Sequence, residues 1–161
     1  MNKKDGCPPG KIKLDGKCTS LKVDVYLYTH GSISSDDSHD DWGTRMYFPE
    51  IMKKEGRHAF PTHQNITQEK GYAKAPFTIT GKDLPDSIKN RDIKHTDICD
   101  ILFSKMNNYD TNPLSIQVGG PRMQKWVNDK KAHTSLSVGD AISINNRIFV
   151  CEKIGWEEAK K

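Results

Sequence analysis

The feature that most constrains this chain is a run near its end, residues 133–156, that reads HTSLSVGDAISINNRIFVCEKIGW. Two short apolar segments, 141–144 and 147–151, flank the dipeptide Asn145-Asn146. Asparagine tolerates the left-handed backbone that a two-residue turn between antiparallel strands requires. The run therefore predicts a β-hairpin near the end of the chain.

The hairpin needs a further strand, because two strands alone are only marginally stable in water. The segment LKVDVYLYT is the best candidate, since Val23, Val25 and Leu27 alternate with other residues at strand spacing. We expect this strand to pair with the hairpin. We also expect Phe149 and Cys151 to point to one face of the hairpin and four β-branched side chains to the other. These four are Ile142, Ile144, Ile148 and Val150.

Two helices are predicted between these strands. The first spans residues 97–107, with Thr96 as its N-cap and apolar side chains at helical spacing. The second spans residues 121–130, and Pro121 suits its first turn. The apolar stripe of this second helix includes Trp126 and is typical of a buried core face.

Together with a short strand around Phe77 and Ile79, these elements indicate an α+β fold. We expect a small antiparallel sheet or a partly closed barrel with two or three helices packed on it and long polar loops. Leu, Ile, Val and Phe make up about one fifth of the chain, a low share that favours such loops. The expected organisation is a flexible cysteine-containing loop at 1–20, a single domain at 21–156 and a polar tail at 157–161.

The four cysteines show no CxxC pair, which removes the strongest sequence sign of a structural zinc site. Cys99 and Cys151 lie in apolar patterns and are expected to be buried. The segment CPPGKIKLDGKC contains turn residues that would bring Cys7 towards Cys18. The amino terminus lacks the apolar core of a signal peptide, so we expect the cytoplasm of a host cell and two thiols. A disulfide or half of a metal site remains the alternative.

One family resemblance comes from the end of the chain. NPL at 112–114, the helix with Gln124 and Trp126, and the run SLSVGD followed by a hairpin and Gly-Trp resemble the YodL-like group of proteins. The similar module covers about residues 112–156. Such proteins occur in phages, plasmids and conjugative elements, so the resemblance implies an accessory protein of a virus or mobile element. It implies no catalytic residues.

The charge balance permits contact with nucleic acid, because 25 basic residues against 21 acidic residues leave a net charge of +4. A basic face is predicted around Trp126 from four cationic side chains. These are Lys125, Lys130, Lys131 and Arg147. The function expected first is therefore a non-enzymatic accessory binding protein that contacts nucleic acid through this face. The alternative partner is a host protein, and a structural virion component is a third possibility. No membrane span and no cofactor are expected.

A metal-dependent hydrolase is the enzymatic alternative. The segment THGSISSDDSHDDWG mixes imidazole and carboxylate groups, which can hold a divalent ion and leave it able to activate water. Its candidate ligands are His30, His39, Asp37 and Asp40. The spacing does not match a calcium-binding loop. Ser135, Ser137 and Asp140 could be read as a nucleophile set, but we expect them to form a strand-entry turn that satisfies backbone N–H groups.

Overall fold

The computed structural model describes residues 7–28, 62–68, 72–89, 91–130, 132, 134–137, 139–152 and 154–161. The strands are β1 (Lys11–Leu14), β2 (Lys17–Ser20), β3 (Lys22–Tyr28), β4 (Tyr72–Thr80), β5 (Asp92–Ile93), β6 (Ala141–Ile144), β7 (Arg147–Cys151) and β8 (Trp156–Glu158). The helices are α3 (His63–Gln68), the 3-10 helix η3 (Gly81–Asp83), α4 (Asp86–Lys89), α5 (His95–Met106) and α6 (Ile116–Lys130).

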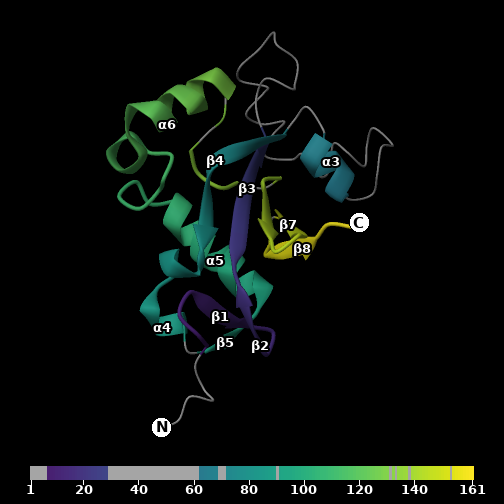
Figure 1. The fold of residues 1–161 in the computed structure, drawn as a ribbon. Helices are drawn as coiled ribbons and strands as arrows, with labels where there is room; N and C mark the ends of the chain where they lie inside the picture. Colours follow the sequence, from purple (N-terminus) through teal and green to yellow (C-terminus); the bar gives the residue numbers. More distant parts are fainter. Residues whose placement is uncertain are drawn as a thin grey trace.

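The fold is α+β, as the sequence predicts. Five strands form an antiparallel sheet in the order β4-β3-β6-β7-β8, and a small mixed sheet has the order β2-β1-β5 (Figure 1). Strands β4 and β8 are the open edges of the larger sheet, so the described strands form a sheet and no closed barrel. No helix in the described ranges is long and apolar enough to span a membrane.

The predicted hairpin is confirmed as β6 and β7. Asn145 and Asn146 have φ values of 47° and 74°, the left-handed geometry that a two-residue turn needs. The hairpin pairs with β3, as expected, through contacts such as Val25 opposite Ile142. This two-residue turn sets the register between β6 and β7.

The predicted faces of the hairpin are wrong. Ile144 pairs with Arg147 across the turn, so Ile142 pairs with Phe149 and shares its face. Residues directly opposite each other in an antiparallel pair point to the same side. Ile148 therefore lies on the other face, in a smaller cluster that also contains Val150. The sequence prediction shifted the second strand by one residue, and such a shift exchanges its two faces.

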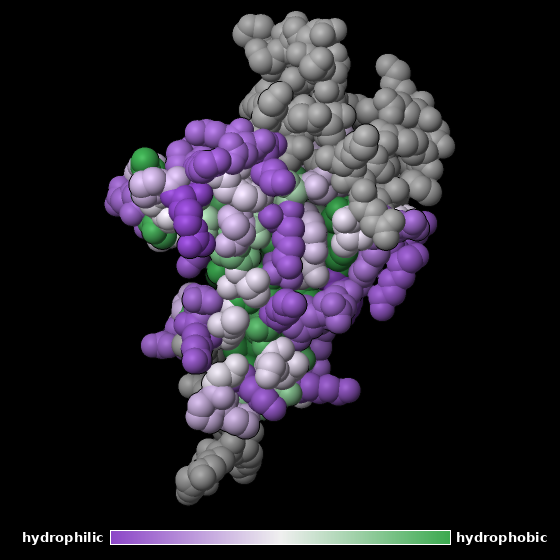
Figure 2. Space-filling model, turned by 45° about the horizontal axis from the view of Figure 1, so that its top comes forward, coloured by the Kyte–Doolittle hydropathy of each residue, from purple (hydrophilic) through white to green (hydrophobic). Residues whose placement is uncertain are grey.

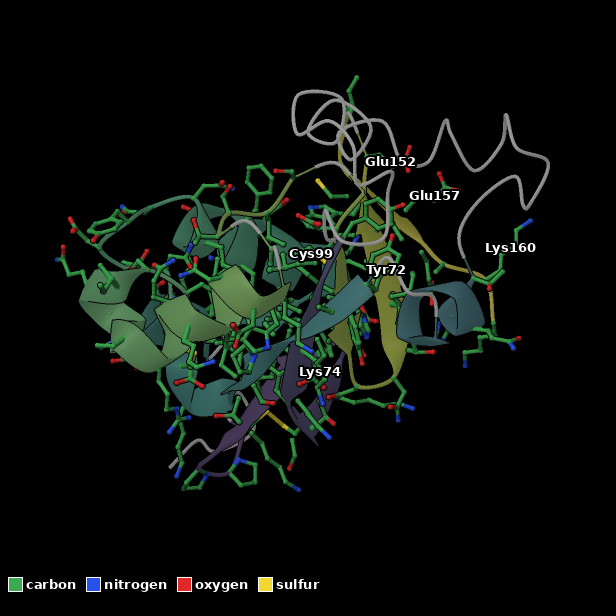
Figure 3. All side chains as sticks on the ribbon, turned by 90° about the horizontal axis from the view of Figure 1, so that it is seen from above. Tyr72, Lys74, Cys99, Glu152, Glu157 and Lys160 are labelled. Carbon is green, nitrogen blue, oxygen red and sulfur yellow. A yellow bond between two sulfur atoms is a disulfide. The ribbon has the colours of Figure 1, made fainter. Side chains whose placement is uncertain are left out.

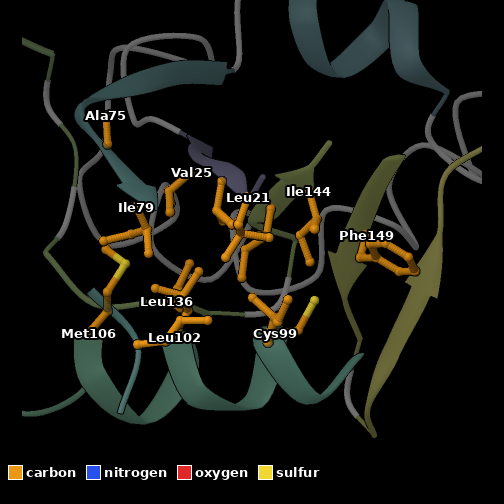
Figure 4. Close-up of a cluster of buried hydrophobic side chains, with 14 of the residues drawn as sticks. Leu21, Val25, Ala75, Ile79, Cys99, Leu102, Met106, Leu136, Ile144 and Phe149 are labelled. Carbon is orange, nitrogen blue, oxygen red and sulfur yellow. The ribbon is translucent and has the colours of Figure 1, made fainter. Parts of the chain in front are cut away.

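Helix α5 covers the larger apolar face of the main sheet (Figure 4). Its residues Leu102 and Met106 are 1% exposed and pack with Val25 and Ile144 in one cluster. The short helix α3 covers part of the opposite face, where Ile66 joins the smaller cluster. Sequence reasoning predicted neither α3 nor the first residues of β4, because residues 57–74 carry no clear periodicity.

The ends of the two longer helices differ from the prediction. Helix α5 begins at His95, one residue before Thr96, which was expected to be the N-cap. The Asp97 carboxylate instead accepts a hydrogen bond from the Lys94 backbone N–H at 2.9 Å, and this closes the first turn. Helix α6 extends back to Ile116 through a kink at Gly120, before the predicted start.

The turn that leads into β6 is held by a fully buried carboxylate. Asp140 Oδ1 accepts a hydrogen bond from the Tyr28 backbone N–H at 2.8 Å. Asp140 Oδ2 accepts one from the Ser137 backbone N–H at the same distance. The expectation that this carboxylate satisfies backbone N–H groups is confirmed. It ties the end of β3 to the turn before β6.

The N-terminal segment is ordered by a covalent bond. Cys7 and Cys18 form a disulfide. The expectation of two thiols is therefore wrong, and the disulfide named as an alternative is observed. Strands β1 and β2 form a hairpin within the segment that the sequence predicted as a loop. Side chains of β1, such as Ile12 at 1% exposure, join the main core. Buried apolar groups and the disulfide both favour this hairpin over an open loop.

The C-terminal residues also take part in the fold. Strand β8 extends to Glu158, inside the segment expected to be a polar tail, and pairs with β7. Ala159 is buried, and Lys160 forms a β-bridge with Thr62. This bridge brings the beginning of α3 to the edge of the main sheet.

Removal of the buried carboxylate should destabilise the fold. In Asp140→Ala the N–H groups of Tyr28 and Ser137 lose their acceptor, and a buried unpaired donor costs about 1–3 kcal/mol. We expect the free energy of unfolding to fall by roughly 3 kcal/mol in urea denaturation. Asp129→Ala, which removes an exposed carboxylate that pairs with Lys125 and with no other described residue, is the control and should cost under about 0.5 kcal/mol. Equal stability of the two variants would contradict the structural role.

The disulfide should contribute measurable stability. It closes a loop with a sequence separation of 11, for which chain-entropy arguments give about 3 kcal/mol. Reductant should therefore lower the urea midpoint of the wild-type chain. The double variant Cys7→Ser/Cys18→Ser should show the lower midpoint with or without reductant. An equal response of the two proteins to reductant would count against the bond.

Candidate functional site

The described residues of the predicted basic face come from two separate elements, α6 and β7. Lys125 and Lys130 are exposed on α6, while Trp126 is half-buried and packs against the core. Arg147 lies at the beginning of β7, and Figure 1 shows β4 and β3 between α6 and β7. Lys131 lies outside the described residues. The structure thus places Lys125, Trp126 and Lys130 on one helix and separates Arg147 from them.

Two of these cations already have acidic partners. Lys125 Nζ lies 2.7 Å from Asp129 Oδ2 one turn along α6. Arg147 donates two hydrogen bonds to the Glu158 carboxylate, at 2.9 and 2.8 Å. The hydrogen bonds with Glu158 raise the pKa of Arg147, and the same bonds lower the pKa of Glu158. A phosphate would have to compete with Glu158 for the Arg147 guanidinium.

Arg147 belongs to a charged cluster that joins the small sheet to the main sheet. Asp15 Oδ2, on the β1–β2 turn, lies 2.9 Å from His95 Nδ1 and 3.8 Å from an Arg147 nitrogen. The His95 and Phe149 rings are 5.6 Å apart, and the Arg147 guanidinium lies over Phe149 at 5.5 Å. These contacts fasten the disulfide-bonded hairpin to the beginning of α5.

Burial lowers the pKa of His95, and the positive charge of Arg147 adds to this effect. Asp15 acts in the opposite direction through its charge and its hydrogen bond, but the net shift is downward. The downward shift favours the neutral imidazole, and the Nδ1–H of His95 can donate to Asp15 whether or not the ring is protonated. The arrangement serves to hold two elements together.

The opposite face of the sheet carries a separate polar group. Asp24 of β3 is buried and accepts a hydrogen bond from the Thr78 hydroxyl at 2.8 Å. Lys74 Nζ lies 3.8 Å from the other Asp24 oxygen (Figure 3). Both partners come from β4. This group compensates a buried charge between two strands, since a buried carboxylate is costly without such partners.

A pocket of about 350 Å³ lies between the end of α5, the following loop, α6 and residues 134–135. None of the described residues that line it carries a charged side chain. Met106 and Ile116 are apolar, and Tyr109 and Gln124 combine apolar and polar atoms. The remaining lining residues carry amide or hydroxyl groups. They are Asn107, Asn112, Ser115, Thr134 and Ser135.

The floor of this pocket is built by Asn112, which is 3% exposed. Its amide nitrogen donates to the backbone carbonyls of Met106, at 2.8 Å, and Thr134. Its amide oxygen accepts from the Leu114 backbone N–H at 2.8 Å. One side chain thus connects the end of α5 with the loop before β6. Asn112 is part of the NPL motif that the sequence singled out for its resemblance.

Two glycines shape the wall formed by α6. A Cβ atom on Gly119 would lie 2.0 Å from the Pro113 carbonyl oxygen, so only glycine fits there. Gly120 has φ at 76° and makes the kink that redirects α6. Pro121 then opens the longer part of the helix, which carries Gln124 to the pocket.

Exposed apolar side chains gather on this side of the molecule. Tyr109 is 56% exposed and Ile116 is 50% exposed, and both line the pocket. Val118, at 48%, follows on the same short helical turn. Figure 2 shows small hydrophobic areas near the left edge, where α6 begins, on an otherwise mostly hydrophilic surface. Apolar groups collected around a pocket are typical of interaction sites.

The candidate metal ligands His30, His39, Asp37 and Asp40 lie outside the described residues. Within the part of the chain that the structure describes, no group of three or more His, Cys, Asp or Glu side chains could hold a metal ion. The metal-dependent alternative therefore stays a prediction. Cys99 and Cys151 are free and buried, as expected.

Sequence reasoning did not predict the pocket. The signals for it were present, because NPL at 112–114 and the pair Gly119-Gly120 before Pro121 suggest a constrained connection. However, the side chains that line the pocket come from four separate segments. Their convergence depends on the long-range hydrogen bond between Asn112 and Thr134, which no local pattern indicates.

The chain is distantly related to a giant-virus protein. It is 36% identical over 63 residues to "Uncharacterized protein R785" of Acanthamoeba polyphaga mimivirus. The match covers 39% of this chain and 54% of the relative, so the chain spans about half the length of the curated relative that it matches. No family model matches the chain, and the YodL-like resemblance stays a prediction. No solved structure matches it either.

The stability of the fold should depend on pH through His95. Its folded-state pKa lies below the ordinary value of 6.5, so the unfolded chain binds a proton first as the pH falls. The contribution of neutral His95 to the free energy of unfolding is complete above about pH 6.5. It decreases as the pH falls towards the folded-state pKa. In urea denaturation at pH 7, 6 and 5, His95→Gln should flatten this decrease while its amide still donates to Asp15. A variant with the wild-type slope would exclude His95 as the source.

Proposed function

We propose that this chain is a non-enzymatic binding protein of viral type that holds a protein partner on the side formed by α5 and α6. The observation that carries the proposal is the uncharged pocket with Tyr109 and Ile116 exposed at its lining. The distant relationship to a giant-virus protein supports the viral setting. A host protein is the kind of partner that an accessory viral protein would bind.

The chemistry of the pocket favours a protein over a nucleic acid. Interfaces between proteins are enriched in aromatic and large apolar groups and depleted of charge at their centres. Tyr109, Ile116 and Val118 supply such groups around an uncharged lining. Binding would remove their apolar surface from water, which stabilises a complex by roughly 25 cal/mol per Å².

Nucleic acid remains a second candidate because α6 is basic. Arg122 and Lys130 are exposed and form no ion pair with any other described residue. They could contact phosphates, and such contacts weaken steeply as salt rises. Arg147 contributes little to this candidate, because Glu158 and Asp15 already neutralise it.

The two candidates are separated by a pull-down from Acanthamoeba lysate, the host that the virus of the relative is named for. We expect the tagged full chain to retain a protein that survives nuclease treatment. Ile116→Ser should release it, because the substitution removes apolar surface at the pocket without opening the core. The matched control is Ile154→Ser, since Ile154 is 93% exposed and lies on the β7–β8 turn.

Retention by the Ile154→Ser control and loss by Ile116→Ser would support the proposal. Equal retention by both variants would contradict it. Bound material that disappears with nuclease or with moderate salt, and that is lost in Arg122→Glu/Lys130→Glu, would replace the protein partner by nucleic acid. Thermal denaturation of each variant checks that the fold is intact.

A further inference from the structure

The size of the pocket limits what part of a partner can enter it. A cavity of about 350 Å³ holds one large side chain with the peptide groups beside it. A whole helix is about 10 Å across with its side chains and would not fit. The part of the partner that enters the pocket is therefore a single anchoring residue on an extended segment.

The lining selects an uncharged anchor. Burial of a charge without a compensating partner is strongly unfavourable, and the lining residues that the structure describes carry no charge. Met106 is 1% exposed at the base, and Ile116 and Tyr109 are half-exposed at the sides. Ile116 and Tyr109 offer an apolar surface to an aromatic or branched side chain, above the buried Met106.

Polar groups around this apolar surface are free to pair with a peptide backbone. The hydroxyls of Tyr109, Thr134 and Ser135 form no hydrogen bond with another described side chain or backbone group. Among the described residues, the Gln124 amide makes a single long contact, of 3.4 Å with Asn128. Amide and hydroxyl groups can both donate to carbonyl oxygens and accept from N–H groups. They match the alternating donors and acceptors of an extended segment.

The charge of the stretch from the end of α5 to the end of α6, which supplies most of the pocket lining, points to acidic flanks on that segment. Between residues 105 and 130 there are four basic side chains against two acidic ones, which leaves a charge of +2. The basic residues are Lys105, Arg122, Lys125 and Lys130, and the acidic residues are Asp110 and Asp129. Charge complementarity of this kind raises association rates and excludes partners of the same sign.

We infer that the pocket between α5 and α6 binds an extended acidic segment of a partner protein and accepts one uncharged aromatic or branched side chain from it. This inference rests on the proposed function and names the chemistry of the partner. Tyr109 and Ile116 contact the anchor. Gln124 and Ser135 pair with the backbone beside it.

The test is an NMR titration of the full oxidised chain with short peptides. The probes have the sequence acetyl-Glu-Ser-X-Ser-Glu-amide, where X is Trp, Phe, Leu, Ala or Lys. We expect shifts at the amides of Asn107, Gln124 and Ser135, with affinity near the millimolar range for the best anchor. Ala or Lys at X should weaken binding at least tenfold. Replacement of the two Glu by Lys should also weaken it, and added salt should reduce that difference.

Two variants test the contacts. Gln124→Leu keeps a side chain of similar size and loses its hydrogen-bonding groups, so it should weaken the affinity for the Trp peptide several-fold. Lys82→Leu on η3 is the matched surface control and should leave the affinity unchanged. Binding that ignores the identity of X, or that is equal in Gln124→Leu and wild type, would overturn the inference.

The failure of this inference can be distinguished from failure of the proposed function. If no peptide shifts the pocket amides while Ile116→Ser still releases the lysate partner, the partner binds this side without an acidic anchoring segment, and the inference is wrong. If Ile116→Ser retains the partner, the proposed function is wrong whatever the peptides do.

Discussion

The arrangement of this molecule depends on the fully buried carboxylate of Asp140. It accepts hydrogen bonds from the end of β3 and from Ser137, so it joins two segments that are 112 residues apart in sequence. The backbone of Asp140 also pairs with Cys151 of β7. One side chain thereby sets where β6 begins, and the register of three neighbouring strands follows from that position.

The same turn positions the candidate site. Leu136, immediately before Ser137, is 2% exposed in the main core. The loop from 134 to 137 is therefore held by the buried Leu136 side chain and by the hydrogen bond from Ser137 to Asp140. The beginning of that loop receives the hydrogen bond from Asn112 and forms one side of the pocket. The pocket therefore has a rigid base made by the core, while Tyr109 and Ile116 remain at the surface.

Local patterns predicted the elements whose stability is local. The Asn145-Asn146 turn, the alternating strand of Val23 to Leu27 and the apolar stripe of α5 were all found. The faces of the hairpin were misassigned because one residue of register reverses every side chain. Helix α3 was missed because it depends on the burial of one residue, Ile66. The N-terminal hairpin and the pocket depend on a covalent bond and on a buried amide that join distant segments, and no periodicity records such contacts.

The division of the four cysteines between surface and core has a consequence for disulfide reshuffling. Cys7 and Cys18 are bonded at the outer hairpin, whereas Cys99 is buried on α5 and Cys151 is buried on β7 of the main sheet. Burial raises the pKa of both buried thiols, that of Cys151 to about 12. Thiol exchange requires a thiolate with access to a disulfide sulfur, and the folded chain denies both conditions to its own free cysteines. In the folded chain, therefore, neither Cys99 nor Cys151 can exchange with the disulfide between Cys7 and Cys18.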